Sequence, residues 1–200
     1  MTITQLVTHS GGFHADELLS SVILTRLFPD ATVLRSRDKA LITPAEGRII
    51  YDVGGDFDAE AGIFDHHQRP NPLREDGQPY SSFGLIWAHY GHDYLRALDV
   101  PEAALLINHR LHKIHHVGMR CRGLLFAGLA LPALLESLKP VFDDREEGVD
   151  DRAFAAALPI ARAFVEASIR RKAAKFRAEA MVMTAIDAAG EGHVPDLPMG

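Results

Sequence analysis

The sequence predicts an α/β fold, with a mostly parallel sheet flanked by helices and followed by a helix-rich segment. In residues 1–100, short apolar runs rich in β-branched side chains alternate with segments whose apolar residues recur every three or four positions. Such alternation of strands and helices favours a parallel sheet with right-handed crossovers. From Pro101 onward the pattern becomes helical. At 200 residues, 47% of them hydrophobic, the chain is long enough to bury a core.

The elements before Pro101 follow from the period of the apolar residues and from the turn signals between them. A glycine turn at Gly11 and Gly12 separates the first strand from the first helix. In chain order we expect a strand at 3–9, a helix at 16–28, strands at 31–37, 48–55 and 62–67, and a helix at 81–91.

The sequence of the second half of the chain predicts helical segments on either side of a polar segment. Residues 129–142 are mainly apolar, and the acidic stretch 143–151 follows them. Residues 151–187 then read as one long or kinked helix, with Pro159 as an interruption. We therefore expect a first domain at 1–150, a helical linker at 151–187 and a tail at 188–200.

Composition and charge limit the function classes. The formal net charge of −6 argues against broad electrostatic capture of nucleic acid, although a local basic surface could still bind it. The single cysteine, Cys121, rules out an intramolecular disulfide and a Cys-rich zinc module, and it favours the reducing cytoplasm. We expect no secretion signal and no membrane anchor, because the N-terminus has no basic region followed by a long apolar one. A homo-oligomer is left open.

Metal-ligating residue types follow three of the predicted strands. The carboxyl ends of parallel strands meet at one edge of a sheet, so residues distant in sequence converge there. Imidazole and carboxylate together suit Mn²⁺, Fe or Zn²⁺, whereas carboxylates and water alone would favour Mg²⁺, so Mn²⁺ is our first choice. The candidates are His9, His14, Asp16 and Glu17 after the first strand, Asp52 after the third, and Asp65, His66 and His67 after the fourth.

Each candidate also has a purely structural interpretation. Asp16 could be the N-cap of the helix that follows, His9 a hydrogen-bonded core histidine, and Asp52 the end of a strand in a glycine-rich turn. Gly54 and Gly55 could form that turn or allow the backbone to approach a phosphate closely. The joint pattern, and no residue alone, favours the functional interpretation.

Four segments, taken in order, resemble a known superfamily. They are THSGGFHADE (8–17), YDVGG (51–55), FDHHQ (64–68) and SSFGLIWAHYG (81–91). They resemble the DHH phosphoesterases, most closely the melanocyte-proliferating-gene family of DHH-type exonucleases, distant relatives of RecJ nucleases and manganese pyrophosphatases. The resemblance implies a DHH domain at 1–150, with a second domain beginning about where this chain ends.

The resemblance also implies a centre that holds two divalent ions. His9, His14 and Asp16 are implied as ligands after the first strand, with His14 where relatives often have an aspartate. Asp52 is implied as the carboxylate that bridges both ions.

The triplet at 65–67 is implied to be catalytic. His66 and His67 would hold a metal or contact the scissile phosphate, with His66 the implied metal ligand, and Asp65 would orient an imidazole. The implied substrate-binding residues are Gly54, Gly55, Ser81 and Ser82, which offer amides or hydroxyls to a phosphate.

Such a centre implies metal-dependent hydrolysis of a phosphoester. Two bound ions, Mn²⁺ first and Mg²⁺, Zn²⁺ or Fe as alternatives, would activate water and stabilise the attacking and leaving oxygens. The implied function is a 3′–5′ exonuclease acting on RNA or short oligonucleotides. Two alternatives remain: a catalytically impaired module of the same fold that only binds metal or nucleic acid, and a hydrolase of small-molecule phosphoanhydrides.

The chain departs from this family after the predicted helix at 81–91. Relatives carry an aspartate motif there, whereas no aspartate lies between Asp99 and Asp143. A histidine could replace the acid, the segment could be a basic patch on a nucleic-acid backbone, or a compensated frame shift could have scrambled it. We prefer the third interpretation because the apolar pattern resumes at 124–144. The residues concerned are His109, His112 and His116 in the first interpretation, and Arg110, Lys113, Arg120 and Arg122 in the second.

Overall fold

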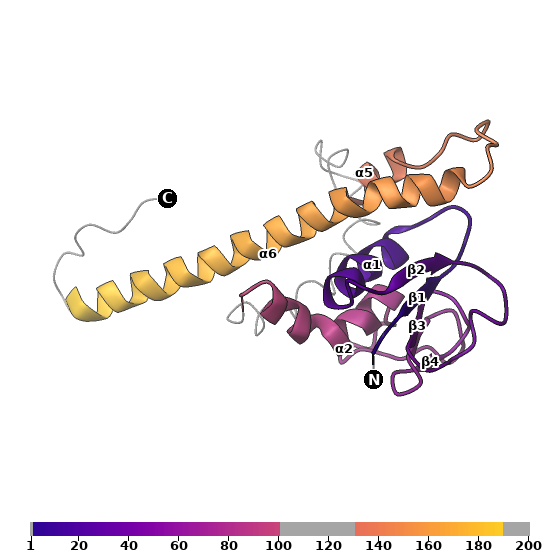
Figure 1. Ribbon diagram of the computed structural model, residues 1–200. Helices are drawn as coiled ribbons and strands as arrows, with labels where there is room; N and C mark the ends of the chain where they lie inside the picture. Colours follow the sequence, from indigo (N-terminus) through magenta and orange to yellow (C-terminus); the bar gives the residue numbers. More distant parts are fainter. Residues whose placement is uncertain (1, 101–130, 190–200) are drawn as a thin grey trace.

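The computed structural model describes residues 2–100 and 131–189. Within this part, five strands form one sheet in the order β2-β1-β3-β5-β4. The first four strands in that order are parallel, and β4 runs antiparallel to β5. Figure 1 labels β2, β1, β3 and β4, which follow one another in this order. The strands are β1 (Gln5–Thr8), β2 (Thr32–Arg35), β3 (Arg48–Tyr51), β4 (Phe57–Asp58) and β5 (Ile63–Phe64).

The predicted fold class is confirmed, because the sheet is mostly parallel and is combined with helices. Four strands fall inside the predicted ranges, and β4 alone has no counterpart there. Its two residues are too few to show a period, and the strand exists only because Phe57 and Asp58 pair with β5.

The helices pack on one another beside the sheet. α1 (Ala15–Leu27) contacts both α2 (Ser82–Ala97) and α6 (Val149–Ala189), and α5 (Leu131–Ser137) contacts α6. The two helices predicted before Pro101 are confirmed, although α2 continues past residue 91 to Ala97. Among the described residues, no helix combines the length and apolarity that a membrane span requires.

Alternate residues of the strands enter two apolar clusters, as the period of a strand dictates. The larger cluster joins strand residues to the helices, and the smaller one joins strand residues to the segment after β2. The larger includes Leu6, Ile49 and Phe64 with Ile23 and Ile86, and the smaller includes Val7, Ile50 and Ile63 with Leu41 and Ile42.

The long helix α6 has two dissimilar halves. Its first half packs on α1 and buries Phe154, Ala157 and Ala161, whereas its second half extends away from the sheet (Figure 1). The predicted interruption at Pro159 is wrong, because the helix continues through it. Proline removes one hydrogen bond from a helix, and the buried residues on either side keep this segment docked.

Candidate metal centre

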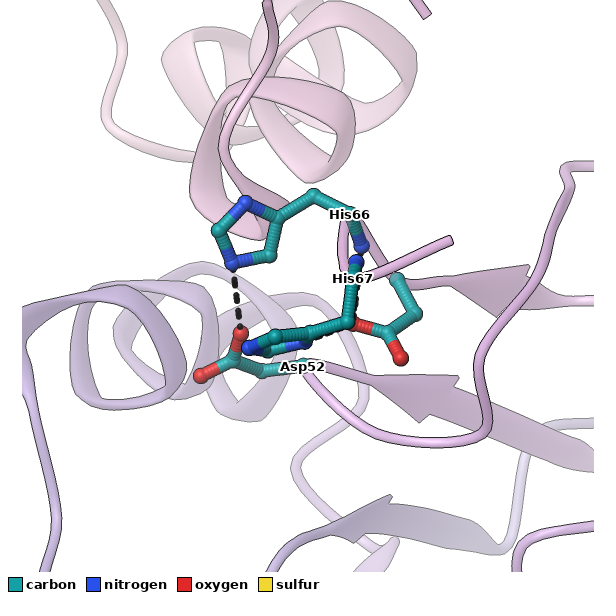
Figure 2. Close-up of side chains that lie close together, drawn as sticks. Asp52, His66 and His67 are labelled. Carbon is teal, nitrogen blue, oxygen red and sulfur yellow. Dashed lines mark hydrogen bonds and ion pairs between the residues drawn. The ribbon is translucent and has the colours of Figure 1, made fainter. Parts of the chain in front are cut away.

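The predicted ligands lie together at the carboxyl edge of the sheet. β1, β3 and β5 are adjacent and parallel, and they are followed by His9, Asp52 and Asp65 respectively. Asp52 lies between two imidazoles, because its Oδ2 is 3.5 Å from His9 Nε2 and its Oδ1 is 3.3 Å from His66 Nε2. Figure 2 shows the contact between Asp52 and His66. The predicted convergence of these side chains is therefore observed.

Asp52 is placed by an unusual backbone conformation. Its φ is +56°, in the left-handed region that aspartate enters more readily than most residues. Two residues later, Gly54 has φ +111° and lies so close to Ile63 that an added Cβ would be 2.7 Å from Ile63 Cδ1. The segment after β3 thus turns sharply beside β5 and directs the Asp52 carboxylate toward both imidazoles.

Asp65 organises the triplet that follows β5. Its Oδ1 accepts hydrogen bonds from His66 N at 2.7 Å and lies 2.6 Å from His67 Nδ1. Its Oδ2 accepts a hydrogen bond from Gly55 N at 2.7 Å. The amide of Gly55 therefore holds this carboxylate, which is 1% exposed, and Asp65 in turn orients the His67 ring.

The first turn of α1 supplies two further carboxylates. His14, and not Asp16, occupies the N-cap position, so the capping interpretation of Asp16 is wrong. Asp16 Oδ1 instead accepts a hydrogen bond from Phe83 N at the start of α2, at 3.1 Å. Asp16 Oδ2 is 3.7 Å from His66 Nε2, so this carboxylate also reaches the centre.

Glu17 was among the candidates that follow the first strand, but the ligand set implied by the resemblance omitted it, and the structure brings it into the centre. It is fully buried, its Oε1 lies 3.0 Å from His9 Nε2, and the same atom accepts a hydrogen bond from His14 N at 2.7 Å. A sequence signal existed: a glutamate three residues after the N-cap is the spacing of a capping box. That signal places Glu17 at the helix start, but its burial beside His9 depends on tertiary packing.

The carboxylates control the protonation of the two imidazoles between them. Asp52, and then Glu17, raise the pKa of His9 to about 10. The pKa of His66 is also raised, chiefly by Asp52. Burial acts to raise the pKa of Asp52, yet His66 and His9 outweigh it and hold that pKa well below its usual range. In the absence of metal, protons on the imidazoles therefore balance buried carboxylates.

The donor set fits divalent ions. The described residues contain two groups in each of which the ligand atoms lie within 4.8 Å of one another. Glu17 Oε2 is buried and accepts no hydrogen bond from the described residues, which is unusual for a carboxylate unless a cation completes its surroundings. The groups are His9, His14 and Glu17, and Asp52, Asp65, His66 and His67.

The predicted substrate-binding serines lie at the start of α2. Ser81 is the N-cap, and its hydroxyl accepts a hydrogen bond from Gly84 N at 3.1 Å. The Ser82 side chain is fully buried, and its hydroxyl has no hydrogen-bond partner among the described residues. The histidines and basic residues predicted between 109 and 122 lie outside the described part of the chain.

These features define an α/β protein with an imidazole and carboxylate centre at the carboxyl edge of its sheet. Residues 5–117 match the model of the MYG1_exonuc family, described as Uncharacterised protein family (UPF0160). This match covers more than half of the chain, so the chain belongs to that family.

Curated relatives give the same family. The chain is 40% identical to a MYG1 protein of Schizosaccharomyces pombe over 103 residues, which cover 48% of this chain and 30% of the relative. It is 38% identical to the MYG1 exonuclease of Homo sapiens over 109 residues, 49% of this chain and 28% of the relative. A MYG1 protein of Caenorhabditis elegans is 37% identical over 126 residues, 56% of this chain and 36% of the relative. The chain thus spans about a third of the length of these relatives, and no solved structure matches it.

Proposed function

We propose that this chain is the DHH-type part of a metal-dependent phosphoesterase, a 3′–5′ exonuclease that acts on RNA or short oligonucleotides. The observation that carries the proposal is the pair of ligand groups joined by Asp52, which contacts His9 in one group and His66 in its own. Human and bovine relatives are named MYG1 exonuclease, which supports a nuclease-like hydrolase with a nucleic-acid substrate.

The residues divide into holding and orienting roles in this proposal. His9, His14 and Glu17 would hold one ion, and Asp52 and His66 would hold the second. When bound, two divalent ions, with Mn²⁺ as our first choice, supply an activated water and stabilise charge on both oxygens of the phosphoryl displacement. Asp16 supports this arrangement, because it contacts His66 and anchors the start of α2.

His67 is the proposed contact for the substrate. Its Nδ1 is engaged by Asp65, and its side chain is 62% exposed, so Nε2 remains for a scissile phosphate. Ser81 and Ser82 at the start of α2 and the Gly54 and Gly55 turn remain the proposed surroundings of that phosphate.

A basic segment of α6 favours a polyanionic substrate. The run RRKAAKFR at 170–177 has five cationic residues and no acidic one, although the whole chain carries a net charge of −6. Arg170, Arg171, Lys175 and Arg177 are exposed. Because buried carboxylates surround the centre, attraction for the phosphates of a nucleic-acid strand has to come from elsewhere on the surface.

The proposal also includes a first domain at 1–150, a helical linker at 151–187 and a cytoplasmic location.

One alternative has its own support. No aspartate lies between Asp99 and Asp143, where relatives of the DHH type carry an acidic motif. A catalytically impaired module that binds metal or nucleic acid would have this feature. A hydrolase of small-molecule phosphoanhydrides is the remaining outcome, which turnover of pyrophosphate would reveal.

The deciding experiment follows hydrolysis of an end-labelled RNA oligonucleotide by the purified chain with Mn²⁺. We expect release of nucleoside monophosphates from the 3′ end, and at least a hundredfold loss of rate in Asp52→Asn. Asparagine tolerates the left-handed conformation of residue 52, so this variant removes charge without forcing the backbone to move. Asp93→Asn removes an exposed carboxylate that pairs with Arg96 on α2 and serves as the matched control. Equal rates in wild type and Asp52→Asn would contradict the proposal.

A further inference from the structure

The loop between β1 and α1 carries two candidate ligands but has little packing at its two central glycines. Gly11 has φ +88°, and a Cβ added at Gly11 or at Gly12 would meet no atom within 4 Å. The loop therefore cannot hold His9 and His14 in place through contacts of its own central residues. Its backbone carbonyls instead accept hydrogen bonds from the end of β2 and from the residues after it: Arg35 Nη2 donates to Gly11 O, and Arg37 Nε donates to Ser10 O at 3.4 Å.

Arg35 joins this loop to the first turns of α6. Its side chain is only 4% exposed, and its Nη1 donates to Asp151 Oδ1 at 2.6 Å. Its guanidinium lies over the Phe154 ring, 4.7 Å from the ring centroid. A guanidinium is planar and presents donors in several directions, so one buried arginine can bind the loop, the helix and the ring at once.

A second contact connects the same two regions. Phe154 meets Phe13 edge to face, with ring centroids 5.8 Å apart and an interplanar angle of 82°. Phe13 is fully buried and directly precedes His14. The first turns of α6 therefore form the outer support of the loop that carries His9 and His14.

We propose that Arg35 is a positioning residue that makes metal binding at His9, His14 and Glu17 depend on the docking of α6. The inference rests on the proposed function for the presence of metal. The other ligand group is held differently, since Asp65 takes its hydrogen bonds from Gly55 and from its own loop. Loosening α6 should therefore weaken the binding of the ion at His9, His14 and Glu17 and leave the binding of the other ion unchanged.

Asp151→Ala tests this coupling with little risk to the fold, because the Asp151 side chain is 57% exposed. In calorimetric titration of the full chain with Mn²⁺, we expect two binding events in wild type and a roughly tenfold weakening of one event in the variant. Asp151→Glu keeps a carboxylate within reach of Arg35 and should restore the affinity. Asp150→Ala is the matched control, because it removes the same charge from the same turn, and the Asp150 side chain makes no hydrogen bond or ion pair with the described residues.

Hydrogen exchange of the metal-free chain provides a readout that needs no ion. We expect faster exchange at residues 10–14 in Asp151→Ala, by roughly tenfold, and unchanged exchange at 63–69. Unaltered exchange at 10–14 would contradict the coupling, and so would an equal loss of affinity for both ions. Absence of Mn²⁺ binding in wild type instead overturns the proposed function, and the exchange result still decides whether Arg35 couples α6 to the loop.

Discussion

The two loops that carry the candidate ligands are stabilised in opposite ways. After β5, the carboxylate of Asp65 gathers His66 and His67 within three consecutive residues and takes one further hydrogen bond from Gly55. After β1, the loop relies on groups from β2 and α6, chiefly Arg35 and Phe154. A short motif with one hydrogen bond from Gly55 can therefore hold the side chains after β5, while the loop after β1 needs elements that lie far away in sequence.

The largest predicted effect comes from removing the organiser of the loop after β5. Asp65→Ala leaves the amides of Gly55 and His66 without their acceptor in a buried site, so we expect the free energy of unfolding to fall by about 3 kcal/mol. Urea unfolding followed by far-ultraviolet circular dichroism measures it. Asp65→Asn keeps one oxygen as an acceptor and should cost less. A loss below that of Asp65→Asn would mean that the loop is held by other contacts.

Added metal should stabilise the fold through both loops. At a Mn²⁺ concentration of about a hundred times the dissociation constant, a single site raises the free energy of unfolding by about 2.7 kcal/mol. Because Asp52 contacts both ligand groups, Asp52→Asn should abolish most of this increase in the free energy of unfolding. Asp151→Ala should reduce only the part of the increase that comes from the ion at His9, His14 and Glu17. Thermal unfolding with and without Mn²⁺ makes the comparison. An equal gain in all three proteins would show that the ion binds elsewhere.

The contrast between the loops also explains which features were predictable. The convergence of His9, Asp52 and Asp65 followed from parallel strands, because adjacent strands share one carboxyl edge. The hydrogen bond from Phe83 to Asp16 joins residues of two different helices, and no local pattern contains it. The burial of Glu17 beside His9 was hidden for the same reason.

The fold shows the same division between local and distant causes. Helices whose apolar residues repeat over several turns were predicted to within a few residues of their observed bounds. The two-residue strand β4 shows no repeat, and it forms only because it pairs with β5. At Pro159 the local rule predicted an interruption, and burial of Phe154 and Ala161 on either side prevailed over it.

A smaller effect is expected at the turn that brings Asp52 toward β5. Gly54→Ala places a side chain at φ +111°, so we expect a loss of about 2 kcal/mol in the free energy of unfolding. Gly77→Ala is the matched control, since Gly77 has φ +74° but no atom within 4 Å of an added Cβ. Its loss should be nearer 1 kcal/mol, in the range usual for a left-handed position without crowding. Equal losses in urea unfolding would show that the contact with Ile63 relaxes without cost.

The smallest predicted effect concerns a direct link between the two halves of the centre. Tyr51 precedes Asp52, and its hydroxyl lies 2.7 Å from Ser21 Oγ on α1. Ser21 Oγ in turn donates to Glu17 O at 2.7 Å, so the Tyr51 hydroxyl is the donor to Ser21. Tyr51→Phe removes one buried hydrogen bond and should lower the free energy of unfolding by about 1 kcal/mol. A double-mutant cycle with Ser21→Ala isolates the pair, and a coupling energy near zero would show that the segment bearing Asp52 and the helix bearing Glu17 are positioned independently.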